Sequence, residues 1–179
     1  MSLKADLELM ARYNQWMNVR LYAAAAQLDE AQWHADRGAF FGSIAATLEH
    51  ILVADTHWLK RFAAAFPALA SLDHVRALPL PAPVCGITFP AFAPLRGERE
   101  AMDAAIVDFT CEAGDELYAR PLHYVNSAGE SHTKPCGLVL RHVFNHQTHH
   151  RGQVTTLFSQ FGIDVGVTDL SALIAEIPA

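Results

Sequence analysis

CGLVLRHVFNHQTHHRGQVTTLFSQF, residues 136–161, is the stretch around which we organise the rest of the chain. At about 100° per residue, seven of its side chains fall on one stripe less than about 90° wide. The stripe consists of Val139, Val143, His146, His150, Val154, Leu157 and Phe161. Steps of three and four residues are typical of a helix face that is turned into a core. We therefore expect one long helix here, with its apolar face buried.

Two members of this stripe, His146 and His150, are one helical turn apart. Side chains at this spacing lie about 5–6 Å apart at Cβ, so both imidazoles can reach one ion at about 2.0–2.1 Å. Each buried ring needs a polar partner, and a shared metal satisfies both rings in their neutral form. The spacing indicates a metal-binding pair. A structural or surface pair of histidines is the alternative, which this stretch alone leaves open.

Other polar residues of the same stretch receive different predictions. His142 and His149 lie on the flank of the stripe, roughly 40–60° from His146. We expect them at the rim of a site, or in contact with the ligands, rather than on the metal. Gln147 and Arg151 are expected to point away from the apolar face, and Arg151 could pair with a carboxylate at a bundle end or dimer seam.

Composition limits the classes of protein to be considered. The 179 residues are 51% hydrophobic and are enough for a single domain, 1–179, with its own core. No apolar run of about 18 residues occurs, so no membrane span is expected. The first residues, MSLKADLELMARYNQW, lack the pattern of a secretory signal. A formal net charge of −6 argues against nucleic-acid binding.

The cysteines favour a reducing compartment. Cys85, Cys111 and Cys136 are odd in number and widely spaced, and no CxxC pair is present. A disulfide framework is therefore not expected, and we predict a cytoplasmic protein. None of the three has a ligand's spacing to His146, so a nucleophile would come from outside the chain.

Three more segments have helical periodicity, namely 3–27, 44–65 and 96–117. With residues 136–161 they predict an all-α four-helix bundle. A short helical turn begins at Asp29, and Ser43 is expected to cap the second long helix. The proline-rich segment 67–95 predicts a long crossover connection of little regular structure, which gives an up-down-down-up order. We expect a small hairpin in 118–134 and, in the tail 163–179, a short helix that caps one bundle end.

The first two predicted long helices contain several polar residues. Asn14 and Asn18 are expected to face solvent, with a polar cavity as the alternative. Asp55 is expected to be a solvated or capping carboxylate, with a role as a metal ligand as the alternative. A second stripe on residues 44–65 contains His50 among small side chains that leave room for an imidazole. Periodicity alone does not favour His50 as a ligand, and the default for His57 is the surface.

Three sequence segments resemble those of a known protein family. The segments FNHQTHHRGQV (144–154), AATLEHILVADTHWLKRF (45–62) and HYVNSAGE (123–130) together resemble the DinB/YfiT-like family of proposed metalloenzymes, over nearly the whole chain. The resemblance implies one divalent transition metal held by His50, His146 and His150, with zinc or nickel foremost and iron as an alternative. Many relatives have Asn where this chain has Glu49. Glu49 points about 100° away from His50, so we do not expect it to ligate; a carboxylate as fourth ligand is the alternative if the helix is rotated.

Three neutral histidines leave at least one coordination position open, which is typical of catalytic metal sites. A bound water would support hydrolysis, and a bound thiol would become an activated thiolate. The resemblance implies a thiol S-transferase with a low-molecular-weight thiol and a small electrophilic substrate, and it implies a homodimer. The alternative is a non-enzymatic, metal-stabilised dimeric binding or stress-response module. An enzyme should have a pocket at the metal, whereas a structural module should have four protein ligands and no cavity.

Overall fold

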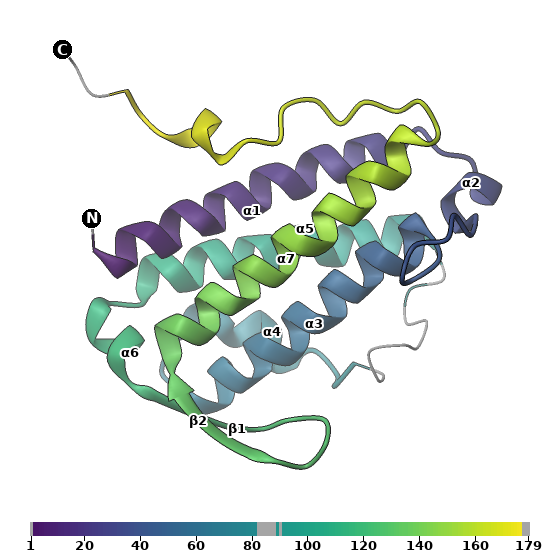
Figure 1. The fold of residues 1–179 in the computed structure, drawn as a ribbon. Coiled ribbons are helices and arrows are strands. Elements are labelled where there is room, and N and C mark those ends of the chain that lie inside the picture. Colours follow the sequence, from purple (N-terminus) through teal and green to yellow (C-terminus); the bar gives the residue numbers. More distant parts are fainter. Residues whose placement is uncertain (1, 82–88, 90, 177–179) are drawn as a thin grey trace.

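The chain is mostly helical, with one small antiparallel sheet, in a computed structural model that describes residues 2–81, 89 and 91–176 (Figure 1). The long helices are α1 (Leu3–Ala25), α3 (Ile44–Ala65), α5 (Phe92–Glu112) and α7 (Cys136–Ser159). The short elements are α2 (Glu30–His34), η1 (Ala70–Leu72), α4 (Asp73–Ala77), α6 (Asp115–Ala119), β1 (Pro121–Val125), β2 (Ser131–Pro135) and η2 (Leu170–Leu173). The prediction of a helical chain with a hairpin before the last long helix is confirmed.

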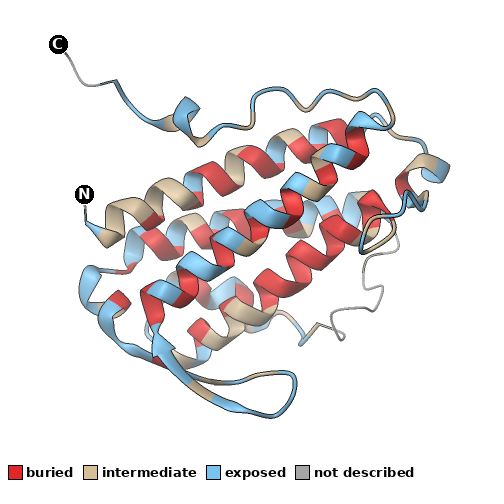
Figure 2. Cartoon of the chain, in the orientation of Figure 1, coloured by how far each residue is buried: buried red, intermediate tan, exposed pale blue. Residues whose placement is uncertain are grey.

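The four long helices pack side by side. Helix α1 lies against α5 and α7, and α3 lies against α7 and α5. Helices α1 and α7 run in one direction, and α3 and α5 run in the other (Figure 1). Their buried faces meet in the interior (Figure 2), where the stripe predicted on α7 contributes Val139, Val143, Val154 and Leu157. This packing brings the middle of α3 against the middle of α7.

Local sequence fixes the helix ends. The side chains of Ser2, Asp29 and Ser43 accept hydrogen bonds from the first turns of α1, α2 and α3. Asp29 forms a full capping box with Gln32, as expected from the sequence. Gly162, with φ of +71°, follows α7 in the left-handed conformation that glycine tolerates.

The connection between α3 and α5 differs from the prediction. It contains η1 and α4, because Leu72 and Val75 are fully buried against the neighbouring helices. Helix α5 begins at Phe92 rather than at residue 96, and it ends at Glu112 before the separate helix α6. The middle of the connection, including Cys85, lies outside the described residues.

The sequence predicted that the C-terminal segment caps one end of the bundle. In the structure it does not cap an end of the helices. It turns after α7 and runs back along α1 (Figure 1), where the Tyr13 hydroxyl donates to the Thr168 carbonyl at 2.6 Å. In the part of this segment that the structure describes, the helical turn η2 has no buried residue, so it lacks the apolar face that a capping helix would need. Within the described residues, no helix has the length and apolar character needed to cross a bilayer.

Candidate metal centre

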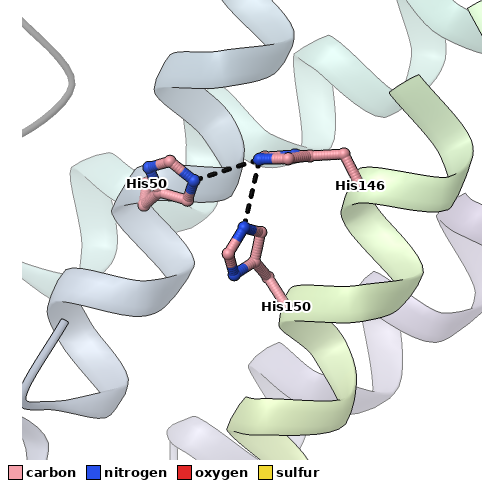
Figure 3. A group of neighbouring side chains, drawn as sticks. All are labelled: His50, His146 and His150. Carbon is pink, nitrogen blue, oxygen red and sulfur yellow. Dashed lines mark hydrogen bonds between the residues drawn. The ribbon is translucent and has the colours of Figure 1, made fainter. Parts of the chain in front are cut away.

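Three imidazoles converge where α3 packs against α7. The Nε2 atom of His146 is 3.1 Å from Nε2 of His50 and 3.1 Å from Nε2 of His150 (Figure 3). The candidate ligand atoms of all three residues lie within 4.8 Å of one another. An ion bound tetrahedrally at about 2.0–2.1 Å would separate its ligand nitrogens by roughly 3.4 Å. The spacing of the rings therefore fits one small cation with little adjustment.

Neighbouring side chains hold the rings in this orientation. The Nδ1 atom of His150 is 2.8 Å from Oε1 of Gln153, which can accept its proton and leave Nε2 to face the centre. The Phe41 ring stacks on His50 at a centroid distance of 4.0 Å and meets His150 edge-on at 5.5 Å. Phe41 thus forms an apolar wall beside two of the three rings.

The environment of His146 and His150 favours the neutral form of their rings. Burial, followed by the neighbouring His150 and His50, lowers the pKa of His146 to about 3. Burial also lowers the pKa of His150 below its usual value. Neutral imidazole is the form that binds a metal, so the rings are ready for a cation at neutral pH.

The acidic residues of α3 lie apart from the three histidines. Glu49 accepts a hydrogen bond from the backbone of Phe89 at 3.0 Å. Among the described residues, the metal-capable group contains His50, His146 and His150 without a carboxylate. The chemistry available to it is therefore that of three neutral nitrogen ligands with further coordination positions open.

The prediction that Asp55 is solvated was wrong. Asp55 is 0% exposed and pairs with Arg99 at 2.5 Å, and Gln147 donates to the same oxygen at 2.7 Å. Burial raises the pKa of Asp55, while Arg99 opposes that rise. The second carboxylate of this cluster, Asp103, lies 2.8 Å from Arg99. A buried arginine thus links carboxylates on α3 and α5.

The predictions for the asparagines of α1 were wrong as well. Asn14 and Asn18 are almost fully buried, and each donates to Asp103 at 2.9 Å. Arg151 is also buried rather than turned away, and it donates to Asn14 and to Thr148. We call the set Asn14, Asn18, Asp55, Arg99, Asp103, Gln147 and Arg151 the polar core.

The polar core joins all four long helices, and two of its members, Gln147 and Arg151, each follow a clustered histidine in the sequence. Sequence reasoning missed it because each polar residue was considered alone. One usable pattern was present: Asn14 with Asn18, Arg99 with Asp103, and Gln147 with Arg151 are each spaced by four residues. Each pair therefore occupies one face of its helix.

A hollow of about 640 Å³ opens beside the clustered histidines, between α3, α7 and the hairpin. Its lining includes two of the clustered histidines together with basic, aromatic and small polar side chains: His50, Ala54, His57, Trp58, Arg61, Tyr124, Val125, Asn126, Ser127, His132, Lys134, His142 and His146. His57, expected at the surface, is half-buried and lines this hollow. Tyr124, on the hairpin, packs against Trp58 at a centroid distance of 5.1 Å.

The remaining candidates lie at the edge of the site or away from it. His142 is exposed and packs edge-on against Trp58 at the rim of the hollow. His149 is exposed beside His150, with its Nε2 atom 3.4 Å from Nε2 of Gln153. Cys136 is buried at the start of α7, where burial raises the pKa of its thiol to about 12. That thiol is therefore not a ready nucleophile.

Comparison with known proteins gives the same family relationship as the sequence segments described above. The profile of the DinB family matches residues 1–177. Protein DinB of Bacillus subtilis (strain 168) is 23% identical over 167 residues, which cover 88% of this chain and 87% of that protein. No solved structure matches the chain significantly.

Proposed function

Since the chain belongs to the DinB family, we propose that it is a metal-dependent enzyme whose single divalent ion is held by His50, His146 and His150. The convergence of three Nε2 atoms, with two separations of 3.1 Å, is the observation that carries this proposal. Imidazole nitrogen suits zinc, nickel and iron alike, and zinc or nickel is our first choice. The four long helices act as a bundle that holds the ligands of α3 and α7 in register.

The hollow beside the histidines favours catalysis over a purely structural ion. A closed structural site uses four protein ligands, whereas a catalytic site keeps a position for water or substrate. The described residues supply three grouped ligands, and the hollow reaches two of them. This combination supports the proposal of a metal-dependent enzyme over the alternative of a metal-stabilised binding module.

The bound ion would act as a Lewis acid, lowering the pKa of a water or thiol at its open position. We propose a thiol S-transferase or a related hydrolase. The residues of this chain would orient the reaction. Gln153 holds the ring of His150, Phe41 excludes water from one side, and the hollow receives the substrate. The thiol cosubstrate, the homodimer and the cytoplasmic location remain predictions.

Metal content of single variants tests the ligand assignment. We expect His146→Ala and His150→Ala to lose stoichiometric metal by elemental analysis, while circular dichroism shows that both remain helical. His149→Ala is the matched control, because His149 is exposed on the same helix and should leave metal content unchanged. Full metal retention in both ligand variants would refute the assignment.

A second experiment separates catalysis from a structural role. The metal-loaded protein is assayed with several cellular thiols and a small electrophile, and for hydrolysis without thiol. Turnover that disappears in His150→Ala and persists in His149→Ala supports the enzyme. Absence of turnover, together with global unfolding after chelation, would instead support a structural ion.

A further inference from the structure

Arg61 lines the hollow, and the proposed metal chemistry assigns it no role. Helix α3 places His50, Ala54, His57 and Arg61 at steps of four, three and four residues, so they share one face. The Arg61 guanidinium lies over the rings of Trp58 and Tyr124, at 4.3 and 4.9 Å from their centroids. Its Nη2 atom donates to the carbonyl of Val125 at 3.3 Å. The side chain is therefore positioned by cation–π contacts, and the one acceptor found for its five N–H groups among the described residues is the carbonyl of Val125.

The charge around Arg61 is one-sided. Lys134, on β2, also lines the hollow, and none of the described residues that line it is acidic. The carboxylate of Glu130 is 3.8 Å from His132 but does not line the hollow. A neighbouring hollow that shares Arg61 adds Lys60 and Arg120, and its described lining residues are likewise free of Asp and Glu. A chain of net charge −6 thus concentrates positive charge beside the clustered histidines.

The separation between Arg61 and the metal ligands sets the length of a molecule that could use both. The guanidinium lies over Trp58, which is eight residues after His50 on the same helix. Eight residues correspond to roughly 12 Å along the axis. A single small anion cannot contact both places, whereas an extended molecule can pack its body against the aromatic side chains between them.

We propose that the hollow binds an elongated organic carboxylate, with its carboxylate on Arg61 and its reactive thiol or electrophilic end at the three-histidine ion. The planar guanidinium matches a carboxylate in two parallel hydrogen bonds, which a lone ammonium such as Lys134 cannot provide. This inference rests on the proposed function, because it requires an ion with an open position at one end of the hollow.

Cobalt(II)-loaded protein and three thiol probes test the inference. Thiolate binding to cobalt produces a charge-transfer absorption band, which reports on the metal end alone. The probes are ω-mercaptooctanoate, the uncharged ω-mercaptooctanol of equal length, and the short mercaptoacetate. We expect ω-mercaptooctanoate to bind about tenfold more tightly than ω-mercaptooctanol, because it adds a charge-assisted pair at Arg61. Mercaptoacetate should not show the tighter binding of ω-mercaptooctanoate, because its carboxylate cannot reach Arg61 when its thiolate is bound to cobalt.

Substitution then assigns the advantage to one side chain. In Arg61→Met the preference for ω-mercaptooctanoate should disappear, while cobalt content, helicity and ω-mercaptooctanol binding stay unchanged. Arg96→Met, an exposed arginine of α5 outside the hollow, should keep the full preference. Thiol bands without a preference for the carboxylate, or a preference that survives in Arg61→Met, would overturn the inference alone. Absence of bound cobalt, or of any thiol band, would overturn the proposed function and the inference with it.

Discussion

Replacing Asp55 with asparagine should destabilise the protein by about 3 kcal/mol, because it leaves the buried Arg99 without one of its two anionic partners. Asp55 and Arg99 are 0% and 2% exposed and lie 2.5 Å apart. Breaking a buried pair by removing one partner costs about 3–5 kcal/mol. We expect the lower end of that range, because Arg99 keeps Asp103 at 2.8 Å.

Urea unfolding followed by circular dichroism measures this loss, with the wild type and Asp6→Asn run in parallel. Asp6 also forms an ion pair at 2.5 Å, with Arg141, but both side chains are partly exposed to solvent. Exposed pairs contribute about 0–1 kcal/mol, so Asp6→Asn should change the free energy of unfolding little. A loss below about 1 kcal/mol for Asp55→Asn would refute the claim that the polar core depends on charge pairing.

The same variant should weaken metal binding. Gln147 of α7 donates to Asp55 of α3 at 2.7 Å, and these are the two helices that carry the clustered histidines. Loosening this contact allows His50 to shift relative to His146. Calorimetric titration with zinc should therefore show lower affinity for Asp55→Asn and unchanged affinity for Asp6→Asn. Unchanged affinity in Asp55→Asn would mean that the polar core stabilises the fold without positioning the ligands.

Three further predictions concern the surroundings of the histidines. Gln153→Leu should weaken zinc binding about 10–100-fold, because it removes the partner of His150 Nδ1, whereas exposed Gln160→Leu should not; calorimetry measures both. In metal-free protein, the pKa of His146 is lowered from 6.5 to about 3. Between these two pH values, the His146 ring is protonated in the unfolded state and neutral in the folded state. Stability should therefore fall as the pH decreases through that window, and thermal unfolding of His146→Asn should show a shallower fall; equal slopes would contradict this. Phe41→Ala should let a chelator remove the metal several-fold faster in stopped-flow mixing, because the ring covers two of the ligands; an unchanged rate would exclude Phe41 as a barrier.

The helices and the clustered histidines were largely predictable from the sequence. Helix α7 carries six of the seven predicted members of the stripe, Phe161 follows its end at Ser159, and all seven are buried or half-buried. His146 and His150 could be paired from spacing, because a helix turn fixes their relation locally. His50 could not be joined to them by periodicity, since 96 residues separate His50 from His146. Only the resemblance to a known family suggested that long-range contact.

The polar core was mispredicted because burial depends on how many faces of a helix have neighbours. Helix α7 packs against both α1 and α3, so Gln147 and Arg151 are buried although they lie off the apolar stripe. A polar side chain in such a place needs partners from other helices, and Asp55 and Asn14 provide them. Single-helix reasoning assigns such residues to solvent, because the partners lie far away in sequence.

Charge balance connects the polar core, the three histidines and the hollow. In the polar core, the formal charges of two arginines, Arg99 and Arg151, are matched in number by those of two aspartates, Asp55 and Asp103. The three imidazoles are neutral ligands, so a divalent ion among them would keep a charge of about +2. Arg61 and Lys134 add positive charge to the adjoining hollow, which has no acidic residue among its described lining. The protein thus leaves this positive charge uncompensated at one location, and a thiolate or carboxylate substrate would supply the missing negative charge.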